Sequence, residues 1–392
     1  MSDQTFDAVV VGGGIMGCST AFQLSKRGLS VAVVEKNAIC TGSTGRSSAI
    51  VRQHYSNKLT ARMALYGLRV FQNFDERVGG ECGFEPRGFL VLVPMEDREG
   101  LESNVALQRG VGINTEVLQP EAVGELLPGA NPSDLVAAAY EPESGYADPH
   151  LTTHSFADAA KRNGARFLLG TEVTGVRFEG GHVTGVDTSA NSLNAPIVIN
   201  CAGPWGARVA AMAGLEVPVS SCRIQVGVFK RPTEAEAPHP VVLDFVHASY
   251  FRPETGGLTL VGLIDPAEAN AVVDPDDYPE HADDDYMLDV GGRWVQRCPP
   301  MEMAERRRGY SGLYGVTPDW HPVIDEVPEG SGHFLCTGFS GHGFKLAPAA
   351  GLMTAELATG EGNPQFDPSL FRLSRFSDGQ LVRGRYDYSI TG

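Results

Sequence analysis

Near the start of the chain the sequence reads Asp7-Ala8-Val9-Val10-Val11-Gly12-Gly13-Gly14-Ile15-Met16-Gly17. An apolar strand thus runs into a Gly-x-Gly-x-x-Gly turn. An apolar helix to Arg27, a second apolar strand and the acid Glu35 follow in order. Each of these signals is common alone, but this sequence of strand, turn, helix, strand and acid within about thirty residues is typical of a dinucleotide-binding βαβ unit.

Each small or acidic residue of this unit has a physical task. Gly12 permits the tight turn, Gly14 lets the backbone approach a pyrophosphate, and Gly17 lets the helix lie close to the strand. The pyrophosphate then meets the positive N-terminus of the helix. Glu35 follows Gly17 by 18 residues, at the tip of the second strand, where its carboxylate can accept hydrogen bonds from ribose hydroxyls.

Composition and charge restrict the partners. The 392 residues carry a formal net charge of −17, which argues against nucleic acid or an anionic membrane surface as a partner. Their length predicts about two domains. Part of the acidity is local, and we interpret that segment as a solvated loop that keeps the protein soluble. Its acids are Asp274, Asp276, Asp277, Glu280, Asp283, Asp284, Asp285 and Asp289.

The cysteines and the apolar runs indicate the cellular compartment of the protein. The seven cysteines show no spacing typical of a zinc site. The first strand begins almost at once, which leaves no room for a signal peptide, and no apolar run reaches the length of a membrane span. We therefore expect a cytoplasmic protein without a metal site.

Hydrophobic periodicity predicts alternating helices and strands at both ends of the chain and a strand-rich middle. Strand-like runs dominate residues 217–306, which indicates a mostly antiparallel sheet inserted into the nucleotide domain. The expected helices span 59–78, 96–109, 120–127, 148–163, 207–213 and 344–358. The expected strands beyond Glu35 span 88–93, 165–169, 172–179, 182–188, 195–201, 222–229, 241–245, 250–252, 258–263 and 332–337.

The first clamp suits either NAD or FAD, and two later segments favour the flavin. Residues 42–48 are expected to bring hydroxyl groups and the Arg46 guanidinium to the same crevice. Residues 338–343 form a second glycine-rich turn that opens another helix. Two helix N-termini directed at one crevice suit a flavin, because the pyrophosphate meets one and the ring edge that becomes negative on reduction meets the other.

With these segments in view, the chain resembles the D-amino acid oxidase and sarcosine oxidase superfamily of FAD-dependent oxidoreductases. The resemblance is closest to the branch of sarcosine oxidase, glycine oxidase and the proline dehydrogenase β-subunit. The run Gly338-Phe339-Ser340-Gly341-His342-Gly343-Phe344-Lys345 is highly specific for it. The matching segments occur in family order, at residues 12–36, 42–55, 200–205, 312–325 and 337–345.

The resemblance implies an α/β fold, with a Rossmann-type, glutathione-reductase-like FAD-binding domain and an inserted, mostly antiparallel substrate domain. We assign residues 1–80, 145–216 and 307–375 to the first domain, 81–144 and 217–306 to the second, and 376–392 to a C-terminal tail. The resemblance also implies that FAD is held by Gly12, Gly14, Ile15, Met16, Gly17, Glu35, Lys36, Ser43, Thr44, Arg46, Ser47, Ser48, Val173, Ala202, Gly203, Trp205, Gly312, Gly338, Gly341, His342, Gly343, Phe344 and Lys345.

Two departures from the family pattern carry expectations of their own. Gly312 occupies the place where some members attach FAD through a cysteine, so we expect noncovalent FAD. Thr259 occupies the place where monomeric sarcosine oxidases have a lysine above the flavin that speeds reaction with oxygen. A dehydrogenase that passes electrons to another acceptor is therefore as credible as an oxidase.

The resemblance also points to residues that would bind substrate. Arg52 and Lys345 stand where sarcosine oxidases grip the substrate carboxylate, and Tyr314 matches a tyrosine near the substrate. A forked guanidinium and a second cation would fix the orientation of a carboxylate. Three further candidates follow from their places in the sequence: His54 close after Arg52, and Tyr250 and Arg252 on one predicted strand of the second domain.

We therefore predict FAD-dependent oxidation of a small secondary amine or amino acid that bears a carboxylate, resembling sarcosine, glycine or proline. The resemblance implies hydride transfer from the α-carbon to flavin N5, which gives an imine. Oxygen or another acceptor would take the electrons, and a homo-oligomer or a heteromeric partner is compatible with the sequence. Alternatives are a flavin-dependent 2-hydroxy acid dehydrogenase that uses His54 or His342 as base, a flavin-bearing subunit of an electron-transfer complex, and a flavin-binding module without turnover.

Overall fold

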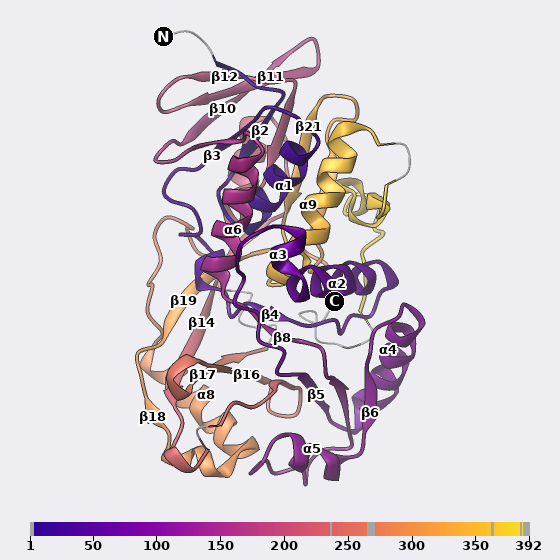
Figure 1. The fold of residues 1–392 in the computed structure, drawn as a ribbon, viewed down its shortest axis with the longest axis vertical. Coiled ribbons are helices and arrows are strands. Elements are labelled where there is room, and N and C mark those ends of the chain that lie inside the picture. Colours follow the sequence, from indigo (N-terminus) through magenta and orange to yellow (C-terminus); the bar gives the residue numbers. More distant parts are fainter. Residues whose placement is uncertain (1–3, 236, 265–270, 362–363, 385, 387–392) are drawn as a thin grey trace.

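The computed structural model describes residues 4–235, 237–264, 271–361, 364–384 and 386. Two main sheets organise these residues. In Figure 1 a Rossmann-type sheet with its helices occupies the upper half, and a large mixed sheet occupies the lower half. None of the described helices is long and apolar enough to cross a bilayer. The mixed α/β fold predicted from the sequence is confirmed.

The Rossmann-type sheet carries the dinucleotide unit at its centre. Its strands β2 and β3 are four-residue apolar runs buried on both faces, as expected for parallel strands covered by helices. Only β20 of the described strands pairs antiparallel here. The order is β20 (Val323–Glu326), β21 (His333–Thr337), β13 (Ile197–Asn200), β2 (Ala8–Val11), β3 (Val31–Val34) and β9 (Arg166–Leu168).

Three helices cover this sheet, and a fourth crosses one of them. Helix α1 (Ile15–Lys26) lies between α6 (Pro149–Arg162) and α9 (Gly343–Thr359) (Figure 1). A side chain at Gly351 would approach the Ser19 hydroxyl to 2.3 Å, so glycine permits close packing of α9 on α1. Helix α2 (Lys58–Gln72) meets the first turn of α9, where a Cβ at Gly67 would lie 2.2 Å from the Lys345 carbonyl oxygen.

The helix boundaries follow local chemistry. The Asn57 side chain caps α2 by accepting a hydrogen bond from the Thr60 amide. Asp148 caps α6 in the same way, and Pro149 occupies its first position. The helix predicted over 59–78 is interrupted at Asn73, where α3 begins. Further described helices are α3 (Phe74–Arg77), α4 (Arg98–Gly110), α5 (Pro120–Leu126) and α7 (Gly206–Met212).

The second main sheet joins strands from two separate stretches of the chain. Strand β15 pairs parallel with β5, and the remaining pairs are antiparallel. The described strands run in the order β18 (Glu305–Arg306), β14 (Ser220–Lys230), β17 (Leu258–Leu263), β16 (Ser249–Glu254), β15 (Val241–Asp244), β5 (Phe89–Val93), β7 (Ala137–Glu141) and β6 (Glu116–Leu118). Strand β19 (Tyr310–Val316), which the sequence assigned to the FAD-binding domain, pairs along β14.

Two smaller sheets complete the described fold. The hairpin of β10 (Val173–Glu179) and β11 (His182–Thr188) forms around Gly180 and Gly181, as predicted. It continues through β12 (Ser192–Asn194) to β1 (Gln4–Thr5). Strands β4 (Ile50–Val51) and β8 (Gly145–Tyr146) pair at the junction of the two main sheets.

The prediction of a solvated acidic loop agrees with the acids from Asp274 to Asp283, which are exposed and lie outside helices, and it is wrong from Asp284 onward. Its C-terminal half begins α8 (Asp284–Arg297), which buries an apolar face against the second sheet, namely Tyr286, Met287, Val290 and Trp294. Acids in the first turn suit the positive helix N-terminus. In the other half, Asp274 and Asp276 form ion pairs with cations of the Rossmann-type half. The negative charges are thus partly compensated by residues that are distant in sequence.

Candidate active site

Three cavities follow one another between the two main sheets. The first, of about 190 Å³, lies beside the glycine turn. It shares lining residues such as Met16 and Thr44 with the second, of about 130 Å³. The second shares Tyr250 and Tyr314 with the third, of about 70 Å³. Because neighbouring cavities share walls, they form one continuous groove, and we keep the names first, second and third cavity for its parts.

The glycine turn at the first cavity is built so tightly that side chains are excluded. Gly12 has φ +111°, and a Cβ there would lie 2.6 Å from the Cys201 carbonyl oxygen. A Cβ at Gly17 would lie 1.9 Å from the Gly12 carbonyl oxygen. At Gly13, which was not among the predicted cofactor residues, a Cβ would press on the Glu35 side chain at 3.0 Å. Gly17 does not line the groove, so its contribution is the packing of α1 against the strand.

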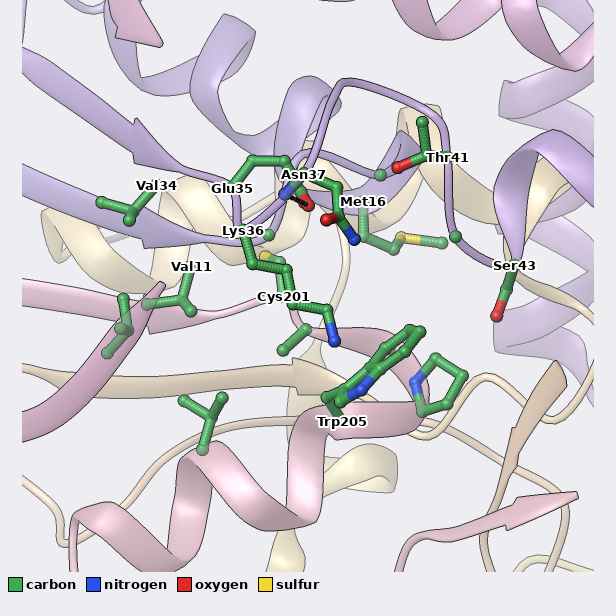
Figure 2. A pocket seen from close by; sticks show the side chains of 18 of the residues that line it. Val11, Met16, Val34, Glu35, Lys36, Asn37, Thr41, Ser43, Cys201 and Trp205 are labelled. Carbon is green, nitrogen blue, oxygen red and sulfur yellow. Dashed lines mark hydrogen bonds between the residues drawn. The ribbon is translucent and has the colours of Figure 1, made fainter. Parts of the chain in front are cut away.

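Glu35 is fixed by backbone amides at the mouth of the first cavity. Its two carboxylate oxygens accept hydrogen bonds from the Gly13 amide at 2.7 Å and the Asn37 amide at 2.8 Å. The side chain lines the cavity, as Figure 2 shows. A carboxylate held in this way keeps further lone pairs for hydroxyl donors, which is the ribose-binding role predicted for it.

Lys36 and Trp205 form the opposite rim of the first cavity. The Lys36 ammonium lies over the indole ring of Trp205, 4.1 Å from its centre (Figure 2). Both contact Asp276, which lies on the side of the molecule that carries the second main sheet. Lys36 forms an ion pair with it, and the indole nitrogen donates a hydrogen bond of 2.9 Å to it. The predicted cofactor residues Val173, Ala202 and Gly203 line the same cavity.

Two uncapped helix N-termini meet at the second cavity, as the sequence predicted. Helix α1 begins after Gly14 and α9 after His342; neither has a side-chain cap or an acid in its first turn. Ile15 and Gly343, one from each helix, line this cavity. The buried Ser43 hydroxyl lines the first and second cavities and has no hydrogen-bond partner among the described residues. Such a group indicates a ligand that would satisfy it.

The other residues of the loop at 44–48 have partners in the protein. Thr44 accepts a hydrogen bond from the Ile15 amide at 3.2 Å, and Ser47 accepts one from Ala49 at 3.0 Å. Arg46 lines the second cavity, while its guanidinium is directed to Glu280. The same cavity is lined by the predicted residues Ser47, Ser48, Gly312, Gly338, Gly341 and Phe344.

The third cavity brings Arg52 and Lys345 together although 293 positions separate them in the sequence. Both side chains are buried, each with 6% of its surface exposed. Arg52 donates to the His54 carbonyl oxygen, and its guanidinium lies over the Tyr55 ring, 4.4 Å from the centre. Its Nη2 also lies 3.4 Å from His342 Nδ1. Three neighbours thus orient this guanidinium.

Lys345 is an unusual residue for the first turn of a helix. Burial and the positive charge of Arg52 lower the pKa of its ammonium well below 10.5. Among the described residues its nitrogen has no hydrogen-bond or ion-pair partner. An anion bound here would be attracted by the Arg52 guanidinium and would favour the charged form of Lys345, so this cavity is suited to an anion.

Two tyrosines complete the wall that the second and third cavities share. A Cβ at Gly262 would lie 2.3 Å from the Tyr250 ring, and a Cβ at Gly341 would lie 2.6 Å from the Tyr314 ring. Each ring therefore lies flat on a glycine. The hydroxyl of Tyr250 is 2.8 Å from that of Ser48, which links the two main halves of the molecule. The predicted positions of both tyrosines beside the groove agree with this geometry.

Some predicted residues lie elsewhere. The Arg252 guanidinium lies over the Tyr146 ring and pairs with Glu254, outside the residues that line the groove. Thr259 is also outside them, fully buried and accepting a hydrogen bond from Arg231 at 2.8 Å. Thr259 shares a face of β17 with Val261 and Leu263, which pack in the core with residues of α8, so it lies away from the groove. The inference about oxygen stays a prediction.

The two histidines considered as bases do not line the groove. His54 Nε2 is 2.9 Å from the Tyr386 hydroxyl, and burial together with Arg52 lowers the pKa of His54 to about 3. His342 is directed to Arg52 and Tyr55, and burial, Lys345 and Arg52 lower its pKa well below 6.5. Both imidazoles are neutral near pH 7, and their role here is to support neighbouring side chains.

Sequence reasoning missed a buried carboxyl group behind Arg52. Glu141 accepts hydrogen bonds from the Gln53 amide at 2.9 Å and the Ser144 hydroxyl at 2.7 Å. Burial raises the pKa of Glu141 to about 7 although these bonds and Arg52 lower it. No motif identifies such a residue, because its burial follows from the pairing of β7 with β5.

Known proteins agree with this geometry. The sequence model of a family described as DAO, FAD dependent oxidoreductase, matches residues 7–357. The chain belongs to this family. FAD is therefore its cofactor, and the groove fits it: the glycine turn, the anchored Glu35 and the unpaired Ser43 hydroxyl are where a dinucleotide needs donors and acceptors. Among the described residues, no cluster of side chains suited to a metal ion competes with it.

Three relatives of this FAD dependent oxidoreductase are informative. It is 29% identical to human mitochondrial sarcosine dehydrogenase over 387 residues, 95% of this chain but 41% of that protein. It is 27% identical to the sarcosine oxidase subunit beta of Rhodobacter capsulatus, in a match that covers 96% of this chain and 90% of that protein. The solved structure of L-proline dehydrogenase from P. horikoshii aligns with a TM-score of 0.89 and 29% identity, covering 97% of this chain and all of that one.

Proposed function

We propose that this protein oxidises a small secondary amine or amino acid that carries a carboxylate. The observation that carries the proposal is the pair of buried cations, Arg52 and Lys345, in the third cavity. The names of its relatives support the substrate class, since sarcosine and proline are both secondary amines with an α-carboxylate. The small volume of the cavity, about 70 Å³, favours a compact molecule.

In this proposal Arg52 and Lys345 bind the substrate carboxylate and thereby orient the α-carbon. The contacts of Arg52 with the Tyr55 ring and the His54 carbonyl oxygen hold the guanidinium before substrate arrives, so little ordering is left to the binding step. Tyr250 and Tyr314 form the wall opposite and exclude water from the α-carbon. FAD, when bound, supplies the acceptor for the two electrons and the hydrogen that leave the substrate.

The same cations explain why no separate base is needed. Two positive charges beside the amine disfavour its protonated form, so the amine binds neutral. Its lone pair is then free to form the carbon–nitrogen double bond of the imine, which water later hydrolyses. A 2-hydroxy acid dehydrogenase would need a base to take the proton of the substrate alcohol. The imidazoles of His54 and His342 are neutral but do not line the groove, which favours amine oxidation over this alternative.

We also propose that FAD is bound noncovalently. Gly312 lines the second cavity and offers no nucleophile, and a Cβ there would lie 3.0 Å from that of Arg46. Acid denaturation followed by filtration tests this directly. Flavin in the filtrate is the expected result, and flavin that stays with the precipitated chain contradicts it.

The substrate proposal is tested with Arg52→Met and Lys345→Met. Each should retain FAD and lose roughly 100- to 1,000-fold in kcat/KM for N-methylglycine, because charge-assisted bonds to the carboxylate are lost. Arg231→Met is the matched control, since it removes another buried guanidinium that lies outside the groove. Unchanged turnover in both Arg52 and Lys345 variants, or equal turnover of N-methylglycine and an amine without carboxylate, would disprove the assignment.

A second candidate role is that of a flavin-bearing subunit in a larger assembly. The support is the match over 90% of a protein named as a subunit, the sarcosine oxidase subunit beta. Anaerobic reduction of the purified chain by N-methylglycine, L-proline and glycine separates the cases. Bleaching of the flavin by substrate followed by fast dye reduction supports an autonomous enzyme. Bleaching without onward transfer supports a subunit that needs a partner as electron acceptor.

A further inference from the structure

Residues 271–283, which we call the strap, connect the second main sheet to α8. The strap lies along β14, since the Arg223 amide donates to the Ala271 carbonyl oxygen at 3.0 Å and the Val273 amide donates to that of Ser221 at 2.9 Å. At its far end Asp283 pairs with the Arg223 guanidinium at 2.8 Å. Both ends of the strap are thus attached to the second sheet, and its acidic middle extends to the Rossmann-type half.

The middle of the strap reaches the rim of the first cavity. Asp276 lines that cavity and forms ion pairs with Lys36 and with Arg208, the latter at 2.8 Å. It also accepts the hydrogen bond from the indole nitrogen of Trp205. Asp274 reinforces this contact by pairing with Arg208 at 2.7 Å and accepting a hydrogen bond from the Asp276 amide at 2.9 Å. Figure 2 shows Lys36 and Trp205 facing each other at this rim.

A second attachment lies over the second cavity. Glu280 of the strap pairs with Arg46 at 2.6 Å, and Arg46 lines that cavity. Arg46 also donates to the Ser311 carbonyl oxygen at 3.1 Å. Apart from Arg223, the cations that pair with the strap are Lys36, Arg46 and Arg208. These three belong to the half of the molecule that carries the glycine turn, and they border the FAD groove.

We propose that the strap retains FAD by closing the groove through Asp276 and Glu280. A dinucleotide that leaves this groove must pass the rim where the strap is attached, so the ion pairs have to open first. Each half-exposed pair contributes little alone, but pairs that share Asp276 and Arg208 open together. The strap gives a function to the acidic cluster, which would otherwise add repulsion near the pyrophosphate.

The test is the rate at which the holoprotein releases FAD to an excess of an apo-flavoprotein trap. Asp276→Asn should release FAD roughly 3- to 10-fold faster than the parent protein. Asp289→Asn is the matched control, because Asp289 forms a similarly exposed pair with Arg293 at 2.9 Å far from the groove. Salt should speed release from the parent protein more than from Asp276→Asn, because it screens the pairs.

Two further variants distinguish closure from direct contact between Asp276 and the cofactor. Asp274 and Glu280 do not line the first cavity, so Asp274→Asn and Glu280→Gln should also speed release if the strap acts as a whole. Release as slow as in the parent protein in all three variants, or acceleration in Asp276→Asn alone, overturns the proposal. The measurement involves no amine substrate, so its outcome is independent of the substrate assignment.

Discussion

The two ends of the groove differ in which part of the chain forms them, backbone at one end and side chains at the other. At the first cavity the chain presents backbone: glycines whose missing side chains allow atoms to approach, an uncapped helix end, and a carboxylate fixed by amides. At the third cavity it presents side chains, the buried Arg52 and Lys345 with two tyrosines beside them. One end suits a cofactor common to a large family, and the other is the end that we propose to bind the substrate.

The contrast teaches where substitutions should act. A backbone site fails when a Cβ is added, and then the cofactor is lost together with everything that depends on it. A side-chain site fails one interaction at a time, so turnover changes while the cofactor stays. The predictions below test this division.

The largest effect is expected for Gly17→Ala. The new Cβ would lie 1.9 Å from the Gly12 carbonyl oxygen, so the turn must shift. We expect a cost of about 2–3 kcal/mol in the free energy of unfolding and a protein purified without yellow colour. Thermal unfolding and the absorbance ratio of flavin to protein measure this. Gly292→Ala is the control, because a Cβ there meets nothing within 4 Å. A yellow Gly17→Ala protein of normal stability would break the comparison.

The next effect concerns the pH dependence of anion binding. Burial and Arg52 hold the pKa of Lys345 well below 10.5, and a bound carboxylate favours its charged form. Above the lowered pKa, binding therefore has to take up a proton, and affinity for an unreactive carboxylate such as acetate should fall as pH rises. Titration of the flavin spectrum gives the dissociation constants. Lys345→Met should bind roughly tenfold or more weakly and with a flat pH profile; a profile unchanged from the parent would contradict this.

The third effect is on stability and lies behind the substrate end. The pKa of Glu141 is about 7 in the folded protein and 4.5 in the reference state, so the folded state binds the extra proton. Its contribution to the free energy of unfolding is complete below pH 4.5 and is lost as pH rises to about 7, on the order of 3 kcal/mol. Glu141→Gln should flatten this part of the stability curve in denaturant titrations. A parent curve already flat between pH 5 and 7 would refute it.

The backbone end could be predicted from sequence because its signals are local. Glycine spacing, strand periodicity and the acid at position 35 all fall within thirty residues, and each reflects a conformational need of the chain itself. The second turn at 338–343 follows the same logic. The convergence of the two helix ends at one cavity then needed only the parallel order of the sheet.

The side-chain end could not be predicted in the same way. Arg52 and Lys345 were assigned through the family resemblance, because no local pattern relates residues so far apart, and their roles stay predictions. Glu141 was missed since a carboxylate on an apolar strand is ordinarily exposed. The ion pairs of the acidic segment were missed because the cationic partners of Asp274 and Asp276 lie 66 to 240 positions away. Helix α8, by contrast, was detectable from the helical spacing of Tyr286, Val290 and Trp294.

The ring of Tyr386 has a consequence for substitutions in this protein. It is buried, lies 5.9 Å from the His54 ring and 5.0 Å from that of Phe245, and so belongs to the packing behind the guanidinium of Arg52. A substitution that removes this ring would therefore disturb the packing that holds Arg52 in place before it touched any reacting atom.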